Sequence, residues 1–185
     1  MATPEIVSVR DYATSRYAQV ADNTEGSLSD ILARAETTIQ TRLGRRLPVT
    51  TYVERWKTQS NTLFVKNRPI VSVTQIRRRP NPVYGWELIN LSYVTINDAG
   101  PGYIECYPYY QSSVAGYEVE VTYTAGYAVI PEDLKEAIIM QAVMFSYQDL
   151  EVYGSGDSKA PGVQYFYEDI DRIIKKYMVT NSVYH

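Results

Sequence analysis

The sequence predicts an α+β fold, with helices at both ends of the chain and strands in the middle. Residues 27–43 place apolar side chains at helical spacing, whereas residues 117–123 alternate between apolar and polar side chains as a half-buried strand does. Residues 134–145 are apolar nearly all round, without the polar face of a surface helix. The predicted order is therefore helix, helix, a long β-rich region, helix and helix.

Length and composition limit the class of protein. The chain has 185 residues, with 45% hydrophobic and 21% charged residues, which is ordinary for one soluble domain. The net charge of −3 lacks the basic excess of a dedicated nucleic-acid-binding protein. The single cysteine, Cys106, excludes an internal disulfide and a cysteine-rich metal site. The longest near-apolar run, residues 137–145, is too short to cross a bilayer, so no membrane contact is expected.

Helix boundaries follow from capping residues. A modest first helix is predicted over about 7–20, and a second begins at Ser27, which can cap it together with Asp30. Gly44 suits the position just after that helix. These signals place two helices before the β-rich region.

The two later helices carry the charge pattern that a helix dipole favours. Pro131 suits the first turn of the third helix, and Glu132 and Asp133 follow it at the positive end of the dipole. The fourth helix is predicted over about 163–178, with acidic residues early and lysines late. The strands between the two helical parts are predicted at residues 50–57, 61–65, 70–79, 86–91, 93–96, 103–106 and 117–123.

Motifs for catalysis or cofactor binding are missing from the sequence. The only histidine, His185, is the last residue, so the commonest general base lacks a fixed environment. No phosphate loop, dinucleotide fingerprint, zinc, calcium or nucleophile-elbow motif occurs. The carboxylates at 132–136 and 168–171 fall in the first turns of helices, where the dipole explains them. We expect no catalytic residue, no cofactor and no metal.

Three consecutive arginines lie in the third predicted strand. Alternation places Arg77 and Arg79 on one face and Arg78 on the other. They fit a charged sheet edge, pairing with an acidic partner, or DNA binding, for which nearby Tyr84 and Trp86 offer stacking surfaces. Arg77 and Arg79 are the predicted contacts with a partner or DNA.

The many tyrosines and the apolar third helix indicate contacts with other proteins. Tyrosine occurs 18 times, against three Phe and two Trp, and tyrosine is enriched at interfaces. The apolar third helix needs covering by its own domain or by a neighbouring subunit, which makes Met140, Met144 and Phe145 the predicted subunit interface. The candidates for partner docking are Tyr165, Phe166, Tyr177 and Tyr184.

Two adjacent segments, Val119–Tyr127 and Ile130–Ile138, resemble the head–tail connector (head-completion adaptor) proteins of tailed bacteriophages. That family pairs a strand ending V-x-Y-x-A-G-Y with a helix starting P-x-D-[LI]-K-x-A-I. Leu43–Leu47 and Pro69–Ile76 resemble two earlier family segments, in family order. The resemblance spans about residues 30–147.

The resemblance implies a small four-helix bundle with a β-rich insertion between the second and third helices. The implied parts are an N-terminal helical part (1–48), a β-rich insertion (49–127) and C-terminal helices with a tail (128–185), in one continuous structural unit. The implied function is a structural ring subunit of the phage neck, which joins the portal of the capsid to the tail and extends the DNA channel. Residues 163–185 would dock on the portal.

The implied partners are other copies of the chain (a ring of about twelve), the portal protein, the next neck or tail protein, and passing DNA without sequence specificity. The protein would be made in the host bacterial cytoplasm and would reside in the virion neck. A tail-terminator or stopper subunit is the alternative, although a β-dominated chain would be expected there. A nucleic-acid-binding module using Arg77–Arg79 and a metal-dependent hydrolase using the carboxylate clusters are further alternatives.

Overall fold

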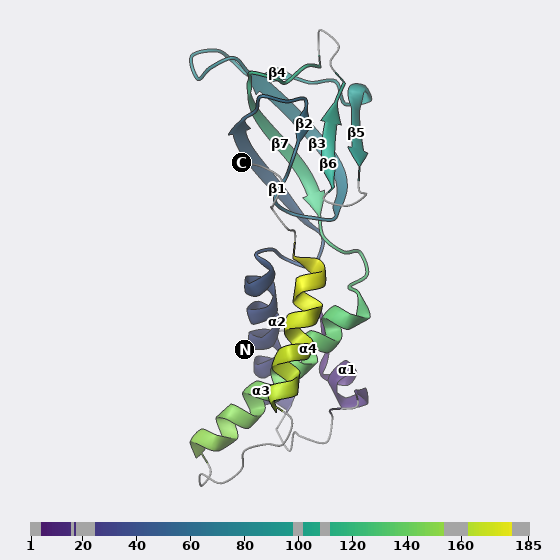
Figure 1. The fold of residues 1–185 in the computed structure, drawn as a ribbon, viewed down its shortest axis with the longest axis vertical. Coiled ribbons are helices and arrows are strands. Elements are labelled where there is room, and N and C mark those ends of the chain that lie inside the picture. Colours follow the sequence, from purple (N-terminus) through teal and green to yellow (C-terminus); the bar gives the residue numbers. More distant parts are fainter. Residues whose placement is uncertain are drawn as a thin grey trace. The chain divides into compact units, whose positions relative to one another are not determined.

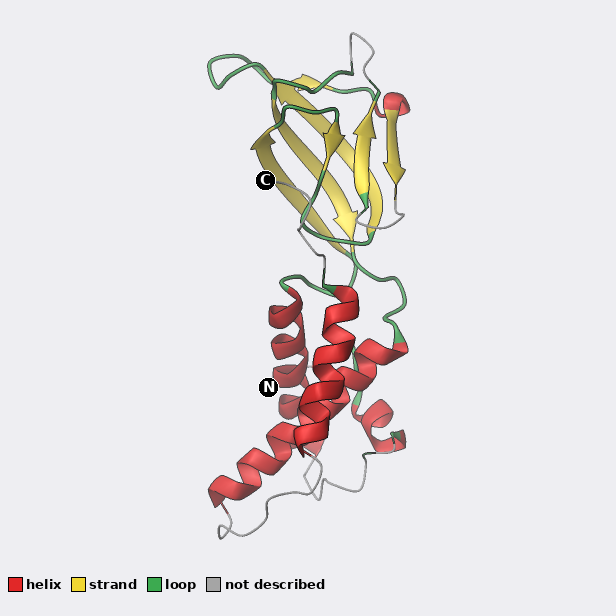
Figure 2. Cartoon of the chain, in the orientation of Figure 1, coloured by secondary structure: helices red, strands yellow, loops and turns green. Residues whose placement is uncertain are grey.

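The structure is a computed structural model that describes residues 5–15, 17, 25–97, 102–107, 112–153 and 163–178. The chain forms two compact units: a helical unit, described over 5–45 and 129–178, and a β unit over 46–128. Figure 2 shows the α-helices in one unit and the strands, with one short 3-10 turn, in the other. Within the described ranges, no helix has the length and apolar character needed to cross a membrane.

The helical unit contains α1 (Val9–Thr14), α2 (Glu25–Leu43), α3 (Glu132–Tyr153) and α4 (Val163–Tyr177) (Figure 1). Helix α3 packs against both α2 and α4. Every residue from Ala137 to Met144 is at most 7% exposed. The apolar character of α3 all round is thus explained by burial within its own unit.

A buried carboxylate fixes the start of the described chain to α2. Glu36 accepts hydrogen bonds from the backbone N–H groups of Glu5 (2.9 Å), Ile6 (2.8 Å) and Val7 (2.8 Å). Helix α1 follows at once, and Ser8 and Asp11 form a reciprocal capping box at its start. The helix ends after six residues, far short of the predicted 7–20.

The β unit consists of two antiparallel sheets. The larger has the strand order β1 (Thr50–Lys57), β7 (Glu118–Ala125), β3 (Ile70–Arg79) and β4 (Glu87–Leu88). The smaller has the order β2 (Thr62–Leu63), β6 (Tyr103–Cys106) and β5 (Val94–Asn97), and a 3-10 turn, η2 (Leu91–Tyr93), precedes β5. The predicted strand 86–91 is therefore reduced to two residues and a turn.

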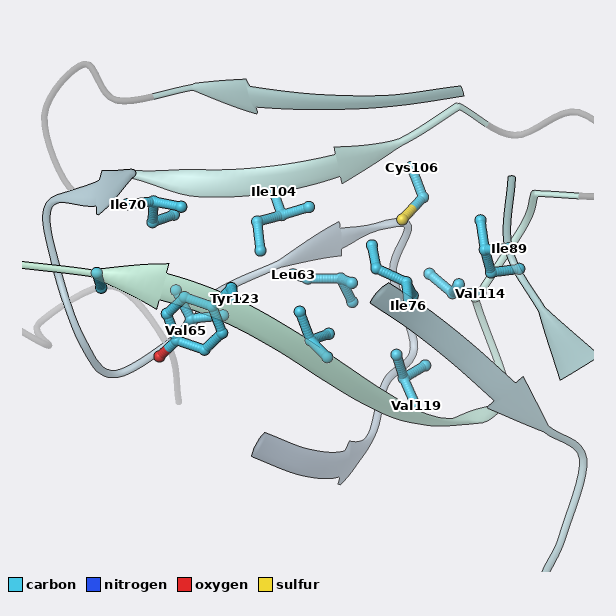
Figure 3. Packing of buried hydrophobic residues seen from close by; sticks show 12 residues of the cluster. Leu63, Val65, Ile70, Ile76, Ile89, Ile104, Cys106, Val114, Val119 and Tyr123 are labelled. Atoms are coloured by element: carbon cyan, nitrogen blue, oxygen red, sulfur yellow. The ribbon is translucent and has the colours of Figure 1, made fainter. Parts of the chain in front are cut away.

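One apolar cluster joins the two sheets. Its residues come from both sheets: Figure 3 labels Val119 and Tyr123 on β7, Ile76 on β3 and Ile104 on β6, and Val121 on β7 belongs to the same cluster. All five of these side chains are fully buried. The β unit therefore has a hydrophobic core of its own.

The ends of the β unit meet beside a required glycine. The N–H of Tyr127 donates to the carbonyl oxygen of Leu47 (2.8 Å), and Pro48 forms a parallel bridge with Tyr127. Gly126 has a φ of +127°, and a Cβ atom there would lie 2.5 Å from the carbonyl oxygen of Pro48. Only glycine fits this combination of backbone angle and close approach.

The predicted small four-helix bundle with a β-rich insertion is wrong. Residues 9–14 form a single short helix, which cannot serve as a full bundle member, because its capping box starts it at Val9 and the chain turns extended at Ser15. The middle of the chain is not an appendage to a bundle, since its two sheets enclose a separate core. Periodicity identified helices and strands one by one but gave no information on which of them share a core.

Candidate interaction surface

The face of the large sheet that points away from the core carries two rows of charged residues. Because Val119 and Val121 of β7 point into the core, the alternating residues Glu118 and Glu120 point to the opposite, outer face. The strand register sets Glu120 between Arg55 of β1 and Arg77 of β3. It likewise sets Glu118 between Lys57 and Arg79.

The carboxylates of this face are paired with its guanidinium groups. Glu120 is buried and accepts from Arg77 Nε at 2.6 Å and from Arg55 Nη2 at 2.5 Å. Glu118 accepts from Arg79 Nε at 2.8 Å. The hydrogen bond from Arg77 lowers the pKa of Glu120, and that from Arg79 lowers the pKa of Glu118. Both glutamates are thus held ionised, and they neutralise much of the arginine charge.

Trp86, from the loop between β3 and β4, packs on this charged array. The centroid of its ring lies 5.1 Å from Cζ of Arg55, 5.0 Å from Arg77 and 4.4 Å from Arg79. These distances are within the range of favourable cation–π contact. The array therefore anchors the loop to the sheet.

Arg78 points to the other face, as alternation predicts. Its guanidinium lies 4.7 Å from the ring centroid of Tyr117, and it pairs with Glu87 (3.3 Å) and the carbonyl oxygen of Ser113. The predicted role of Arg77 and Arg79 as contacts with a partner or DNA stays a prediction. The structure adds that both are bonded to carboxylates of their own chain.

Besides Trp86, the same loop and the adjoining strand β4 carry large apolar side chains that are exposed. Val83 is 92% exposed and Tyr84 60%, and Leu88 on β4 is 69% exposed. Sequence reasoning considered Tyr84 only as a stacking partner for nucleic acid and missed this patch. Its signal in the sequence is an apolar pair directly after Pro80-Asn81-Pro82, and in the structure this pair lies in the turn closed by the hydrogen bond from the N–H of Tyr84 to the carbonyl oxygen of Asn81.

The predicted subunit-interface residues lie on α3. Met140 and Met144 are buried inside the helical unit. Phe145 is partly exposed, and the guanidinium of Arg34 lies 3.9 Å from the centroid of its ring. Their role in contacts between subunits stays a prediction.

The predicted docking residues occupy both ends of α4. Tyr165 is 72% exposed, whereas Phe166 packs edge-on against Tyr17, with 5.5 Å between ring centroids. Tyr177 donates from its hydroxyl to Asp133 Oδ1 at 2.6 Å, which ties the end of α4 to the start of α3. Tyr184 lies outside the described residues. Docking by these residues stays a prediction.

Reactive groups are few in the described part of the chain. Burial raises the pKa of the Cys106 thiol to about 11, so the thiolate is disfavoured at neutral pH. Within the described ranges, no three His, Cys, Asp or Glu side chains gather in a group that suits a metal ion. The described residues present ion-paired side chains and exposed apolar side chains, and both occur in protein interfaces.

Solved structures share this fold over nearly the whole chain. A chain in the neck of an empty gene transfer agent (GTA) particle, computed with C6 symmetry, matches with a TM-score of 0.58 and 17% identity over 96% of this chain and 95% of that chain. A chain of the native GTA virion matches with a TM-score of 0.58 and 16% identity, over 98% of this chain and 94% of that chain. A chain in the native GTA neck, computed with C12 symmetry, matches with a TM-score of 0.57 and 18% identity, over 96% of this chain and 95% of that chain. The fold is thus shared with chains of the GTA virion and of its neck.

A family model for head completion proteins matches residues 5–178, so the chain belongs to the head completion protein family. This confirms the predicted resemblance to head-completion adaptors and the predicted class, a structural head–tail protein. A comparison with curated proteins gave no match.

Proposed function

We propose that this chain is a structural ring subunit of the neck of a tailed phage or phage-like particle. It joins the portal of the head to the tail and extends the DNA channel. The observation that carries the proposal is the coverage: the family match spans residues 5–178, and the fold shared with GTA chains includes both the helical and the β unit.

A ring of twelve copies is the assembly that we propose. Two of the similar chains come from necks computed with C6 and with C12 symmetry. Twelve identical subunits obey both symmetries, whereas a ring of six obeys only the first. The copy number rests on those particles and on the shared fold.

The subunit acts by binding and not by chemistry. The head completion family and the virion neighbours support this assignment. We assign no catalytic residue, cofactor or metal. Arg77 and Arg79 are bonded to Glu120 and Glu118 of their own chain, which weakens their hold on phosphate and suits a duplex that must slide past without sequence specificity.

Docking on the portal is assigned to α4 and the residues after it. The exposure of Tyr165 supports this, because an exposed tyrosine at a helix surface supplies both apolar area and a polar tip. Phe166, Tyr177 and Tyr184 complete the proposed contact. The other end of the ring is left for the next neck or tail protein.

The mass of the purified protein, measured by light scattering with and without a portal ring, tests the proposed function. We expect either a ring of about twelve copies or monomers that assemble on the portal. Replacing Tyr165 by Ser should weaken portal binding, whereas replacing the exposed Tyr93 of the β unit by Ser should not. A chain that stays monomeric beside the portal contradicts the proposal.

A further inference from the structure

The loop between β3 and β4 has a surface that nothing in its own chain covers in the described residues. Val83, Tyr84 and Leu88 are more than half exposed, and Glu87 lies beside them. We call these four residues the β3–β4 tip. Burial of apolar side chains of this size is the main favourable term in protein association, so the tip is suited to a protein partner.

The tip is held in a fixed shape. Asn81 accepts from the N–H of Val83 through Oδ1 (3.0 Å) and from the N–H of Tyr84 through its carbonyl oxygen (3.2 Å). Pro80 and Pro82 restrict the backbone on both sides of Asn81. With Trp86 anchored on the arginine array, the loop is ordered before any partner arrives. A preordered loop loses less conformational entropy on binding.

The β1 edge of the same sheet offers a complementary surface. Among the described strands, β1 pairs with β7 alone, so it is an edge strand of the described sheet. On its outer face Val53 is 62% exposed, and the basic side chains of Arg55 and Lys57 are also exposed. We define the β1 edge by these three residues.

The two surfaces match in both apolar character and charge. The β3–β4 tip combines apolar side chains with the carboxylate of Glu87, whose side chain is well exposed although it bonds to Arg78. The β1 edge combines Val53 with two bases. Strands β1 and β4 lie at opposite edges of the sheet, and within one chain only Trp86 of the loop reaches Arg55. Val53 and the apolar side chains of the tip all stay more than half exposed, so a second copy can bury them.

We propose that the β3–β4 tip of one subunit docks on the β1 edge of the next copy in a ring. Such a contact joins two different surfaces, and repeating it around an axis closes a ring in which every copy uses both. The inference rests on the proposed function, and it names the surfaces through which the ring closes. A second copy is favoured over a different protein because the complementary surface is present on this chain.

Removing the apolar side chains of the tip tests the contact. The double variant Val83→Ser/Tyr84→Ser should raise the protein concentration for half-maximal ring assembly by about tenfold or more, on the portal if the ring forms only there. The matched control Val71→Ser/Tyr93→Ser removes exposed side chains of the same types elsewhere in the β unit and should leave assembly unchanged. Light scattering gives the mass, and circular dichroism shows that each variant is folded.

A charge exchange tests the orientation of the contact. Lys57→Glu and Glu87→Lys should each reduce assembly, and the two together should restore it, because the opposite charges face each other again. Lys66→Glu makes the same charge change at an exposed lysine outside the β1 edge and should have no effect. If one single variant fails to fold, the restored double variant and the serine pair still decide the question.

Three results separate the possible failures. Wild-type rings together with unchanged assembly of the serine pair overturn the docking proposal and leave the proposed function intact. Normal rings that no longer bind portal or tail protein overturn it as well, and assign the tip to that partner. A wild-type chain that forms no ring even with the portal overturns the proposed function, and the docking proposal with it.

Discussion

Among the residues whose burial the structure describes, each of the two units buries one glutamate, and the two carboxylates have different kinds of hydrogen-bond donors. In the helical unit Glu36 accepts three backbone N–H groups from residues 5–7. In the β unit Glu120 accepts from the side chains of Arg55 and Arg77. The first carboxylate holds a chain segment in place, whereas the second holds side chains of neighbouring strands together.

The two sites differ in the number of side chains on which their electrostatic stabilisation depends. Backbone donors remain when a side chain is substituted, proline excepted, so the Glu36 site depends on a single side chain. The Glu120 site is shared among several side chains and covered by Trp86, and part of it is open to solvent. We therefore expect the loss of Glu36 to be the more costly of the two.

The largest expected effect comes from removing a buried side chain from the hydrophobic core of one unit and following the unfolding of both units. Replacing Ile104 by Ala removes a fully buried side chain of the β unit and should cost it about 2–5 kcal/mol of unfolding free energy. The far-UV circular dichroism of the helices should keep its midpoint, because their core is separate. Ile138→Ala is the matched control and should lower the helical transition. A single melt that shifts equally for both variants contradicts separate cores.

A smaller effect is expected at Glu36. Glu36→Ala leaves three N–H groups without their acceptor and should cost about 3 kcal/mol, because hydrogen bonds to charged groups are the stronger ones. Hydrogen exchange of the amides of residues 5–7 should become fast. Glu36→Gln keeps one acceptor oxygen and should fall between wild type and alanine. Unchanged exchange in Glu36→Ala would refute the assigned role.

At Glu120 the expected effect depends on pH. The pKa of Glu120 is lowered below its ordinary 4.5 in the folded protein, so its contribution is complete above that value and is lost as pH falls through the lowered pKa. Glu120→Gln should lower the unfolding free energy of the β unit at neutral pH by about 1–2 kcal/mol. It should also weaken the decrease of that free energy on going to acid pH. Denaturant unfolding between neutral pH and pH ~3 measures both. An acid limb identical to wild type would assign the pH dependence to other groups.

The smallest effect is expected at the cap of α1. Ser8→Ala removes the acceptor for the N–H of Asp11 and should cost about 1 kcal/mol. Because α1 has only six residues, the loss should appear as faster amide exchange over residues 9–14, with little change in the global melt. Ser8→Asp should retain the cap. Equal exchange in the alanine and aspartate variants would show that the cap is dispensable.

Strand alternation predicted the outer face well. Separating Arg77 and Arg79 from Arg78 needs only the two-residue period, and the observed register agrees. Their carboxylate partners were missed, although the same alternation places Glu118 and Glu120 on one face of the neighbouring strand. That signal was present, but the pairing of β3 with β7 joins segments about forty residues apart, which no local pattern specifies.

Other features had no local signal. Glu36 lies near the middle of an ordinary helical pattern, and its partners are backbone groups some thirty residues earlier. The start of α3 beside Pro131 was predicted because proline and the helix dipole act locally. The assignment of elements to two cores depends on distant packing, which is why the predicted bundle was wrong.

The closure of the β unit at Leu47, Gly126 and Tyr127 has a consequence for how such proteins diversify. Its first and last strands are paired throughout, so the chain enters and leaves the unit at one place. Loops at the far ends of the strands, the β3–β4 loop among them, can lengthen or change sequence without disturbing that junction. Natural selection can therefore change what this unit binds while the helices keep their sequence, whereas Gly126 leaves no room for a side chain.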